Sequence, residues 1–118
     1  MIRLLPLLAA AVLASAVPAV AHSLLLESDP QADATVAASP ARLWLRFNNR
    51  IEKRLCRVRL LAERGAPRVL AVAVDGDTVD RLSADVPPLG PGLYRVEWQV
   101  LSTDGHVVSG FFKFRVAP

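Results

Sequence analysis

The sequence predicts an all-β protein, an antiparallel seven-stranded β-sandwich or barrel of the immunoglobulin-like or cupredoxin-like Greek-key type. Three observations predict this class. Several short segments alternate apolar and polar residues, which is the period of a half-buried strand. Turns rich in Gly, Pro and Asp separate these segments, as in sandwich folds. No helical period appears in residues 22–118.

The first 21 residues are predicted to lie outside this fold. Arg3 precedes an uncharged apolar run that ends in the small-residue sequence Ala-Val-Ala. These are the three parts of a secretory signal peptide, and the run is shorter than the roughly 20 apolar residues of a membrane span. We therefore predict a signal peptide over residues 1–21 and one domain over residues 22–118. A cut after Ala16 is the alternative, but it would shorten the apolar run.

Seven segments of the predicted domain are expected to be strands, at residues 22–28, 41–47, 57–61, 68–74, 78–86, 93–100 and 107–116. Alternation predicts which side chains face the core. These are Leu43, Leu45 and Phe47; Val58 and Leu60; Tyr94, Val96, Trp98 and Val100; and Val108, Gly110, Phe112, Phe114 and Val116. The last two strands should form a hairpin across the sequence LSTDGH, because Asp-Gly is typical of tight turns.

Charge and cysteine content favour a soluble, exported monomer. The chain has 14 basic and 11 acidic residues, and the basic ones are spread over several segments. Such interleaved arginines favour a solvated surface over nucleic-acid binding. Cys56 is the single cysteine, so we expect no intrachain disulfide. A small half-buried residue is the favoured interpretation of Cys56, ahead of a metal or redox role.

The two histidines of the chain suggest a metal site. A cut after residue 21 makes His22 the first residue of the processed chain, so its α-amine and imidazole could close one chelate ring. Asp104 and His106 lie two apart, and residues two apart on an extended segment project to the same side. The combined set of three nitrogens and one oxygen suits Cu(II), and no thioether or thiolate is offered for Cu(I). The residues alone leave a plain Asp-Gly turn with a surface histidine open as well.

Two stretches of the sequence resemble one protein family. "AHSLLLESDPQADATVAASPARLWLRF" is similar to the start, and "LPPLGPGLYRVEWQVLSTDGHVVSGFFKFRV" to the end, of the CopC/PcoC family of periplasmic copper-binding proteins. The second stretch carries the pattern S-x-D-G-H-x-x-x-G-x-F-x-F. The resemblance covers essentially all of residues 22–118.

The resemblance implies a copper-binding protein with a cupredoxin-like or immunoglobulin-like fold. It implies export to the periplasm, one Cu(II) per processed chain, and ligands at His22, Asp104 and His106. The implied function is a copper carrier or buffer in copper resistance or transport, with no enzymatic activity. The partner that it implies is a CopD-like inner-membrane copper transport protein.

The sequence departs from the family pattern in two places. Some members bind Cu(I) in a methionine-rich loop, whereas Met1 is the single methionine here, so a Cu(II)-only type is expected. Some members also carry an acidic residue after the strand at 41–47, where this chain has Asn48 and Asn49. A fourth side-chain ligand is therefore doubtful, and Glu52 is a conceivable substitute.

An enzyme is the alternative function. A terminal histidine with a second histidine also resembles the brace of copper-dependent polysaccharide monooxygenases. Oxygen activation needs Cu(I), however, and a carboxylate from Asp104 would stabilise Cu(II). A domain of this size also leaves little room for a substrate platform.

Overall fold

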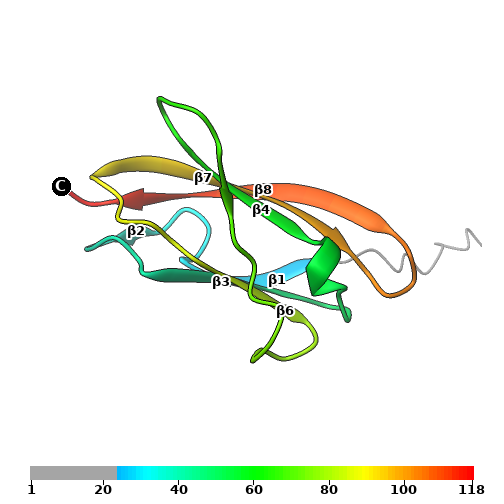
Figure 1. Ribbon diagram of the computed structural model, residues 1–118. Helices are drawn as coiled ribbons and strands as arrows, with labels where there is room; N and C mark the ends of the chain where they lie inside the picture. The colour runs from blue at the N-terminus through cyan, green and yellow to red at the C-terminus, as the bar shows by residue number, and fades with distance from the viewer. Residues whose placement is uncertain (1–23) are drawn as a thin grey trace, which may run out of the picture.

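Two sheets pack face to face in the computed structural model, which describes residues 24–118 (Figure 1). The strands are β1 (Leu25–Asp29), β2 (Thr35–Val36), β3 (Arg42–Phe47), β4 (Arg57–Ala62), β5 (Arg68–Leu70), β6 (Arg81–Asp85), β7 (Gly92–Leu101) and β8 (Val107–Val116). A 3-10 turn, η1 (Lys53–Leu55), precedes β4. The predicted signal peptide over 1–21 lies outside the described residues.

The sheets confirm the predicted all-β sandwich. One sheet has the order β1-β3-β6 and the other the order β2-β8-β7-β4-β5, so the chain crosses repeatedly between them. The predicted hairpin is also confirmed, because β7 and β8 pair antiparallel in ten register positions, from Gly92 opposite Val116 to Leu101 opposite Val107. This hairpin forms the centre of the larger sheet.

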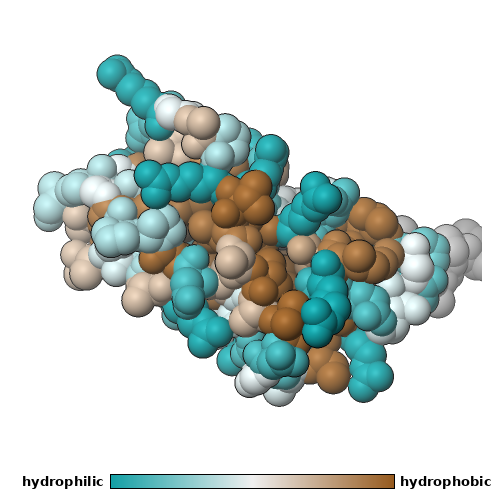
Figure 2. Space-filling model, in the orientation of Figure 1, coloured by the Kyte–Doolittle hydropathy of each residue, from teal (hydrophilic) through white to brown (hydrophobic). Residues whose placement is uncertain are grey.

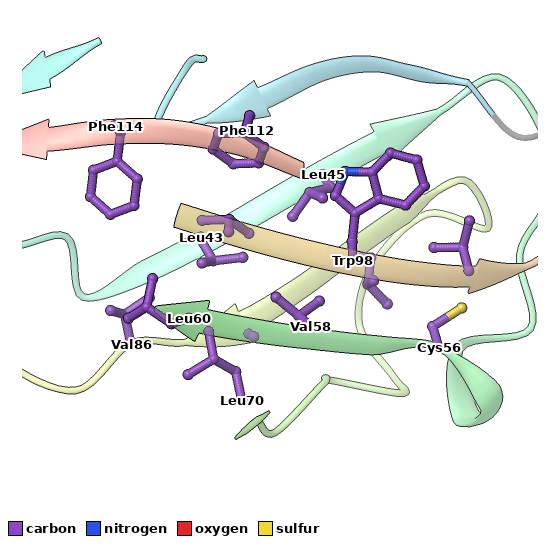
Figure 3. Close-up of a cluster of buried hydrophobic side chains, with 14 of the residues drawn as sticks. Leu43, Leu45, Cys56, Val58, Leu60, Leu70, Val86, Trp98, Phe112 and Phe114 are labelled. Carbon is purple, nitrogen blue, oxygen red and sulfur yellow. The ribbon is translucent and has the colours of Figure 1, made fainter. Parts of the chain in front are cut away.

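The core lies between the sheets and contains most of the predicted inward side chains (Figure 3). It also contains buried residues that were not among those predicted: Ile51, Cys56, Leu70, Leu82, Ala84 and Val86. Leu43, Leu45 and Phe47 on β3 are fully buried. They face the inward side chains of β4, β7 and β8, most of which are less than a tenth exposed. Alternation along each strand thus assigns one face to the core, as the hydrophobic effect requires of a sheet with one solvated side.

Trp98 and Gly110 fit closely against each other across two strands. They are register partners on β7 and β8, and a Cβ added at Gly110 would lie 2.3 Å from Cζ2 of Trp98. The indole ring therefore occupies the space of a side chain at position 110. Its other neighbour is Phe47, edge-on at a ring-centroid distance of 5.1 Å.

The structure differs from the sequence-based expectation in two strands. Thr35 and Val36 form a two-residue strand that pairs parallel with the end of β8, so one pairing is not antiparallel and the described residues hold eight strands. The expected strand at 68–74 ends at Leu70, after which Val72 makes only an isolated bridge to Ala84. Val72 packs against the core without continuing the strand, and Val74 is exposed, so the apolar run did not indicate a longer strand.

The surface of residues 24–118 is mixed in character. Figure 2 shows hydrophobic atoms gathered in a band along one side of the sandwich, between hydrophilic side chains. Val69 and Val79 are among the exposed apolar residues, at 73% and 51%. Nowhere in residues 24–118 is there a helix with the length and apolarity that a membrane crossing requires.

Candidate metal centre

The turn between β7 and β8 holds Asp104 and His106 in a closed, hydrogen-bonded loop. The amide of Gly105 donates to the carbonyl of Ser102 at 2.9 Å, and the amide of Ser102 donates to the carbonyl of His106 at 3.0 Å. Gly105 has a φ of 89°, a left-handed conformation that glycine adopts without strain. Asp-Gly at this position is therefore explained by the turn, whereas nothing in the turn requires a histidine at 106.

Asp104 and His106 lie against each other in this turn. Nδ1 of His106 is 3.2 Å from Oδ1 of Asp104, and the His106 amide donates to the same oxygen at 3.2 Å. The hydroxyl of Ser102 also donates to Oδ1. Ser102 is only 2% exposed, whereas the side chains of Asp104 and His106 are 37% and 59% exposed. A buried serine thus fixes a carboxylate that remains open to solvent.

These contacts keep the carboxylate charged. Hydrogen bonds from the Ser102 hydroxyl and then from the His106 amide hold the pKa of Asp104 below its usual value, because both donors stabilise the ionised form. Asp104 therefore offers an ionised carboxylate at neutral pH.

The spacing of the pair suits a shared metal ion. Two ligand atoms that each lie about 2 Å from a metal, a right angle apart, are separated by about 3 Å. The Oδ1–Nδ1 distance of 3.2 Å matches that separation. Within residues 24–118, however, no group of three or more His, Cys, Asp or Glu side chains is placed to hold a metal ion. The turn therefore brings together two side chains with suitable donor atoms, and a metal site here would need further ligands from elsewhere.

Of the other candidate ligands, His22 lies outside the described residues. Glu52 is described, but the structure does not bring it into a three-ligand group with Asp104 and His106. Its backbone instead connects η1 to β7, because its amide donates to the carbonyl of Leu101 at 2.9 Å. We therefore drop Glu52 as a substitute ligand.

Cys56 has the structural role that the sequence favoured. It is 7% exposed, and its thiol donates to the carbonyl of Glu52 at 3.3 Å. Burial is the main cause that raises the pKa of the thiol, because a thiolate is poorly solvated there. The metal-binding form of cysteine is the thiolate, so the environment of Cys56 disfavours metal binding.

The described chain begins at the same end of the sandwich as this turn (Figure 1). The amide of Leu24 donates to Oδ1 of Asn48 at 2.7 Å, and the amide of Asn48 donates to the carbonyl of Leu24 at 3.1 Å. Two residues further on, the carbonyl of Arg50 accepts from the amide of Thr103 at 3.2 Å. The segment at 48–50 thus connects the start of β1 to the β7–β8 turn.

Two residues of this region were not predicted from the sequence. Ser102 was missed, although a hydroxyl two residues before an Asp-Gly turn is a common local hydrogen-bonding pattern. Asn48 was considered only as a missing acidic ligand. Asparagine directly after a strand often hydrogen-bonds backbone, and that signal indicates its observed role.

Comparisons with known proteins agree with this fold. A CopC domain matches residues 25–117. Copper resistance protein C of Escherichia coli is 31% identical over 113 residues, which cover 89% of each chain. The crystal structure of CopC from Methylosinus trichosporium OB3b superposes with a TM-score of 0.75 at 35% identity, covering 82% of this chain and 95% of that chain.

A second solved structure is similar. PcoC, a methionine-rich copper resistance protein from Escherichia coli, gives a TM-score of 0.68 at 32% identity over 81% of this chain and 99% of that one. A domain match over most of the chain, with relatives above 30% identity, confirms the resemblance seen in the sequence. This chain belongs to the CopC family of copper resistance proteins.

Proposed function

We propose that this protein, processed to begin at His22, is a periplasmic Cu(II) carrier or buffer that binds one ion through His22, Asp104 and His106. The observation that carries the proposal is the Asp104–His106 pair. Nδ1 of His106 lies 3.2 Å from Oδ1 of Asp104, and that carboxylate accepts a hydrogen bond from the buried Ser102. Its relatives by name act in copper resistance, and this pair is where a copper ion would find an oxygen and a nitrogen ligand.

The hydrogen bonds that connect Leu24 to the turn support a contribution from His22. Leu24 is tied through Asn48 to the segment that contacts Thr103. Two extended residues span at most about 7 Å, so His22 stays within a short reach of Leu24. Its α-amine and imidazole would complete a set of three nitrogens and one oxygen, which suits Cu(II).

The same ligand set supports binding without catalysis. A carboxylate ligand stabilises Cu(II), and soft thioether ligands that select Cu(I) are missing from residues 22–118, since Met1 is the single methionine. In this respect the chain differs from PcoC, which is described as methionine-rich. A CopD-like inner-membrane protein is the partner that we propose for copper delivery.

The deciding experiment compares three proteins: the chain starting at His22, the same chain with one Gly added in front, and His22→Ala. The added Gly leaves every side chain in place but turns the α-amine of His22 into an amide, a much poorer ligand. We expect the Gly-extended protein to bind Cu(II) more weakly by orders of magnitude, with an altered electron paramagnetic resonance spectrum. An unchanged affinity and spectrum would rule out the terminal amine as a ligand.

A further inference from the structure

Positive charge is concentrated on the outer face of the five-stranded sheet. Five of the six charged side chains that point outward from its strands are cations: Arg57, Arg59, Arg95, Lys113 and Arg115, with Glu97 as the single acid. We call this set of five cations the basic face. The remaining charged residues of 24–118 comprise eight basic and ten acidic residues, so the rest of the domain carries a slight negative charge.

Only part of the basic face is neutralised within the domain. Glu97 lies between two arginines, with an oxygen 2.5 Å from Arg59 and another 3.2 Å from Arg95. Arg57, Lys113 and Arg115 make no ion pair with any residue of 24–118. The face therefore keeps a net positive charge at neutral pH.

The arrangement of these cations is unfavourable for folding alone. Arg95 and Lys113 are direct register partners on β7 and β8, and like charges directly opposite each other destabilise an antiparallel pair. Arg115 follows on the same side of β8. An external anion would turn this repulsion into attraction. The three-stranded sheet has a like-charged register pair as well, Arg46 opposite Arg81, but there Arg46 lies beside Glu27.

Apolar groups lie among the cations. Leu61, Leu93, Arg95 and Lys113 line a shallow depression of about 200 Å³, with Glu63 at its rim. The Arg95 guanidinium also stacks over the ring of Phe111 at 3.7 Å, and Phe111 is 54% exposed. Cations interleaved with exposed aliphatic and aromatic groups match the headgroup region of an anionic bilayer, where both kinds of side chain are stabilised.

The outer face of the three-stranded sheet has no such surplus. Its cations pair with acids, since Arg46 lies 3.4 Å from Glu27 and Arg42 lies 3.8 Å from Asp85. Arg81 stacks over Trp44 at 4.2 Å. This difference indicates which of the two faces would meet an anionic surface.

We propose that the basic face docks the protein on membranes that contain anionic phospholipids. Docking would lay the five-stranded sheet against the headgroups and leave the β7–β8 turn at one end of the contact. The proposal rests on charge and shape alone and does not require copper to be bound.

Vesicle binding by the chain from residue 22 tests the proposal, because residues 24–118 contain every described strand and the whole core. The protein would be sedimented at low and at high salt with two kinds of vesicle. One is pure phosphatidylcholine, and the other contains about 30% of the anionic lipid phosphatidylglycerol. The test variant is Arg57→Gln with Lys113→Gln and Arg115→Gln, which touches no ion pair described here. The matched control is Arg54→Gln with Arg64→Gln and Arg68→Gln, which removes the same charge from exposed positions elsewhere.

We expect salt-sensitive binding to the anionic vesicles alone. The test variant should bind them about a hundredfold more weakly, because each cation near an anionic surface strengthens binding about fivefold, and the control should be nearly unaffected. Equal losses of vesicle affinity in both variants would show that binding depends on net charge alone, and would overturn the proposal. Absence of vesicle binding, with capture of polyglutamate by the wild type but not the test variant, would assign the face to an acidic protein instead. Unchanged copper binding in both variants would keep this result separate from the proposed function.

Discussion

The two ends of the sandwich carry the two most distinctive motifs of the sequence, and they serve different purposes. At one end, residues 88–94, with the sequence PLGPGLY, are used for packing. Tyr94 is 9% exposed, its hydroxyl donates to the carbonyl of Gly90 at 2.7 Å, and its ring stacks on Phe114 at 5.7 Å. At the other end, the D-G-H motif leaves its carboxylate and imidazole exposed in a turn.

The difference shows how a motif's environment separates structure from function. At the Tyr94 end, the tyrosine hydroxyl and the Gly90 carbonyl hydrogen-bond to each other within the fold. At the turn, the buried Ser102 orients a carboxylate that the core does not need. Polar groups that are fixed but exposed are candidates for ligand binding, whereas fixed and buried ones stabilise the fold.

The largest expected effect separates the two ends directly. His106→Ala should weaken Cu(II) binding by at least about a thousandfold, or roughly 4 kcal/mol, and leave the free energy of unfolding within about 0.5 kcal/mol, as for an exposed site. Tyr94→Phe should do the reverse, costing about 1 kcal/mol of stability at unchanged affinity. Copper titration and urea unfolding of both variants measure this, and a large stability loss in His106→Ala would contradict the distinction.

Between the two ends, Gly110→Ala should destabilise the fold by about 3 kcal/mol, the upper range for overpacking. The new methyl group would meet the Trp98 ring at 2.3 Å. Gly90→Ala is the matched control, since nothing lies within 4 Å of the added carbon there. Denaturant unfolding followed by tryptophan fluorescence gives both values. Equal stability of the two variants would show that the ring moves aside without cost.

Acid should release copper from the turn end. The terminal amine and imidazoles ordinarily titrate near 7.7–8.0 and 6.5, and they must lose their protons to ligate. Affinity should therefore fall on the order of a hundredfold from pH 8 to pH 6. Asp104 does not cause this loss, because its lowered pKa keeps it ionised throughout that window. Its stabilising contacts are present above the usual carboxyl pKa and disappear only as the pH falls through the lowered value. A flat affinity profile would exclude the nitrogen ligands.

Asn48→Ala should weaken copper binding by about tenfold, or roughly 1.4 kcal/mol, because Leu24 loses the acceptor that holds it near the turn. Asn49→Ala is the neighbouring control. The decisive comparison repeats Asn48→Ala in the Gly-extended protein, where the terminal chelate is already lost. A double-mutant cycle should show the effect of Asn48 vanish there. An equal loss in both backgrounds would assign Asn48 a general role in stability.

The smallest effect is expected at Cys56. Cys56→Ser should change Cu(II) affinity less than about twofold, since its thiol is buried, protonated and bonded to the Glu52 carbonyl and a thiol in that form is not a ligand. Cu(I) should bind poorly to either protein under reducing conditions. Tight Cu(I) binding that Cys56→Ser abolishes would show that the thiol reaches the metal.

The sequence predicted those parts of the molecule that follow a period. Alternation identified the inward side chains of β3 and β7, and the Asp-Gly turn signal indicated the hairpin that joins β7 to β8. Alternation could not identify β2, because a strand of two residues shows no period. It also could not identify the end of β5 at Leu70, because Val72 beyond it is apolar for packing and not for strand pairing.

The candidate site was predicted in a different way. Residue chemistry and family resemblance indicated Asp104 and His106, which the turn brings together. Ser102 was missed although its local pattern was present, because its hydroxyl acts on a residue only two positions away. The partner of Asn48 could not be predicted, because Leu24 lies 24 positions away in the chain.

The parallel pairing of β2 with the end of β8 has a practical consequence for building copper sensors. Ala117 continues this pairing through its amide, which donates to the carbonyl of Val36 at 2.9 Å, and the C-terminus lies at the opposite end from the β7–β8 turn (Figure 1). A fluorescent reporter or surface tether appended after Pro118 would therefore sit far from the ion. The same attachment in front of His22 would defeat the purpose, because it would convert the terminal amine that we propose as a copper ligand into an amide.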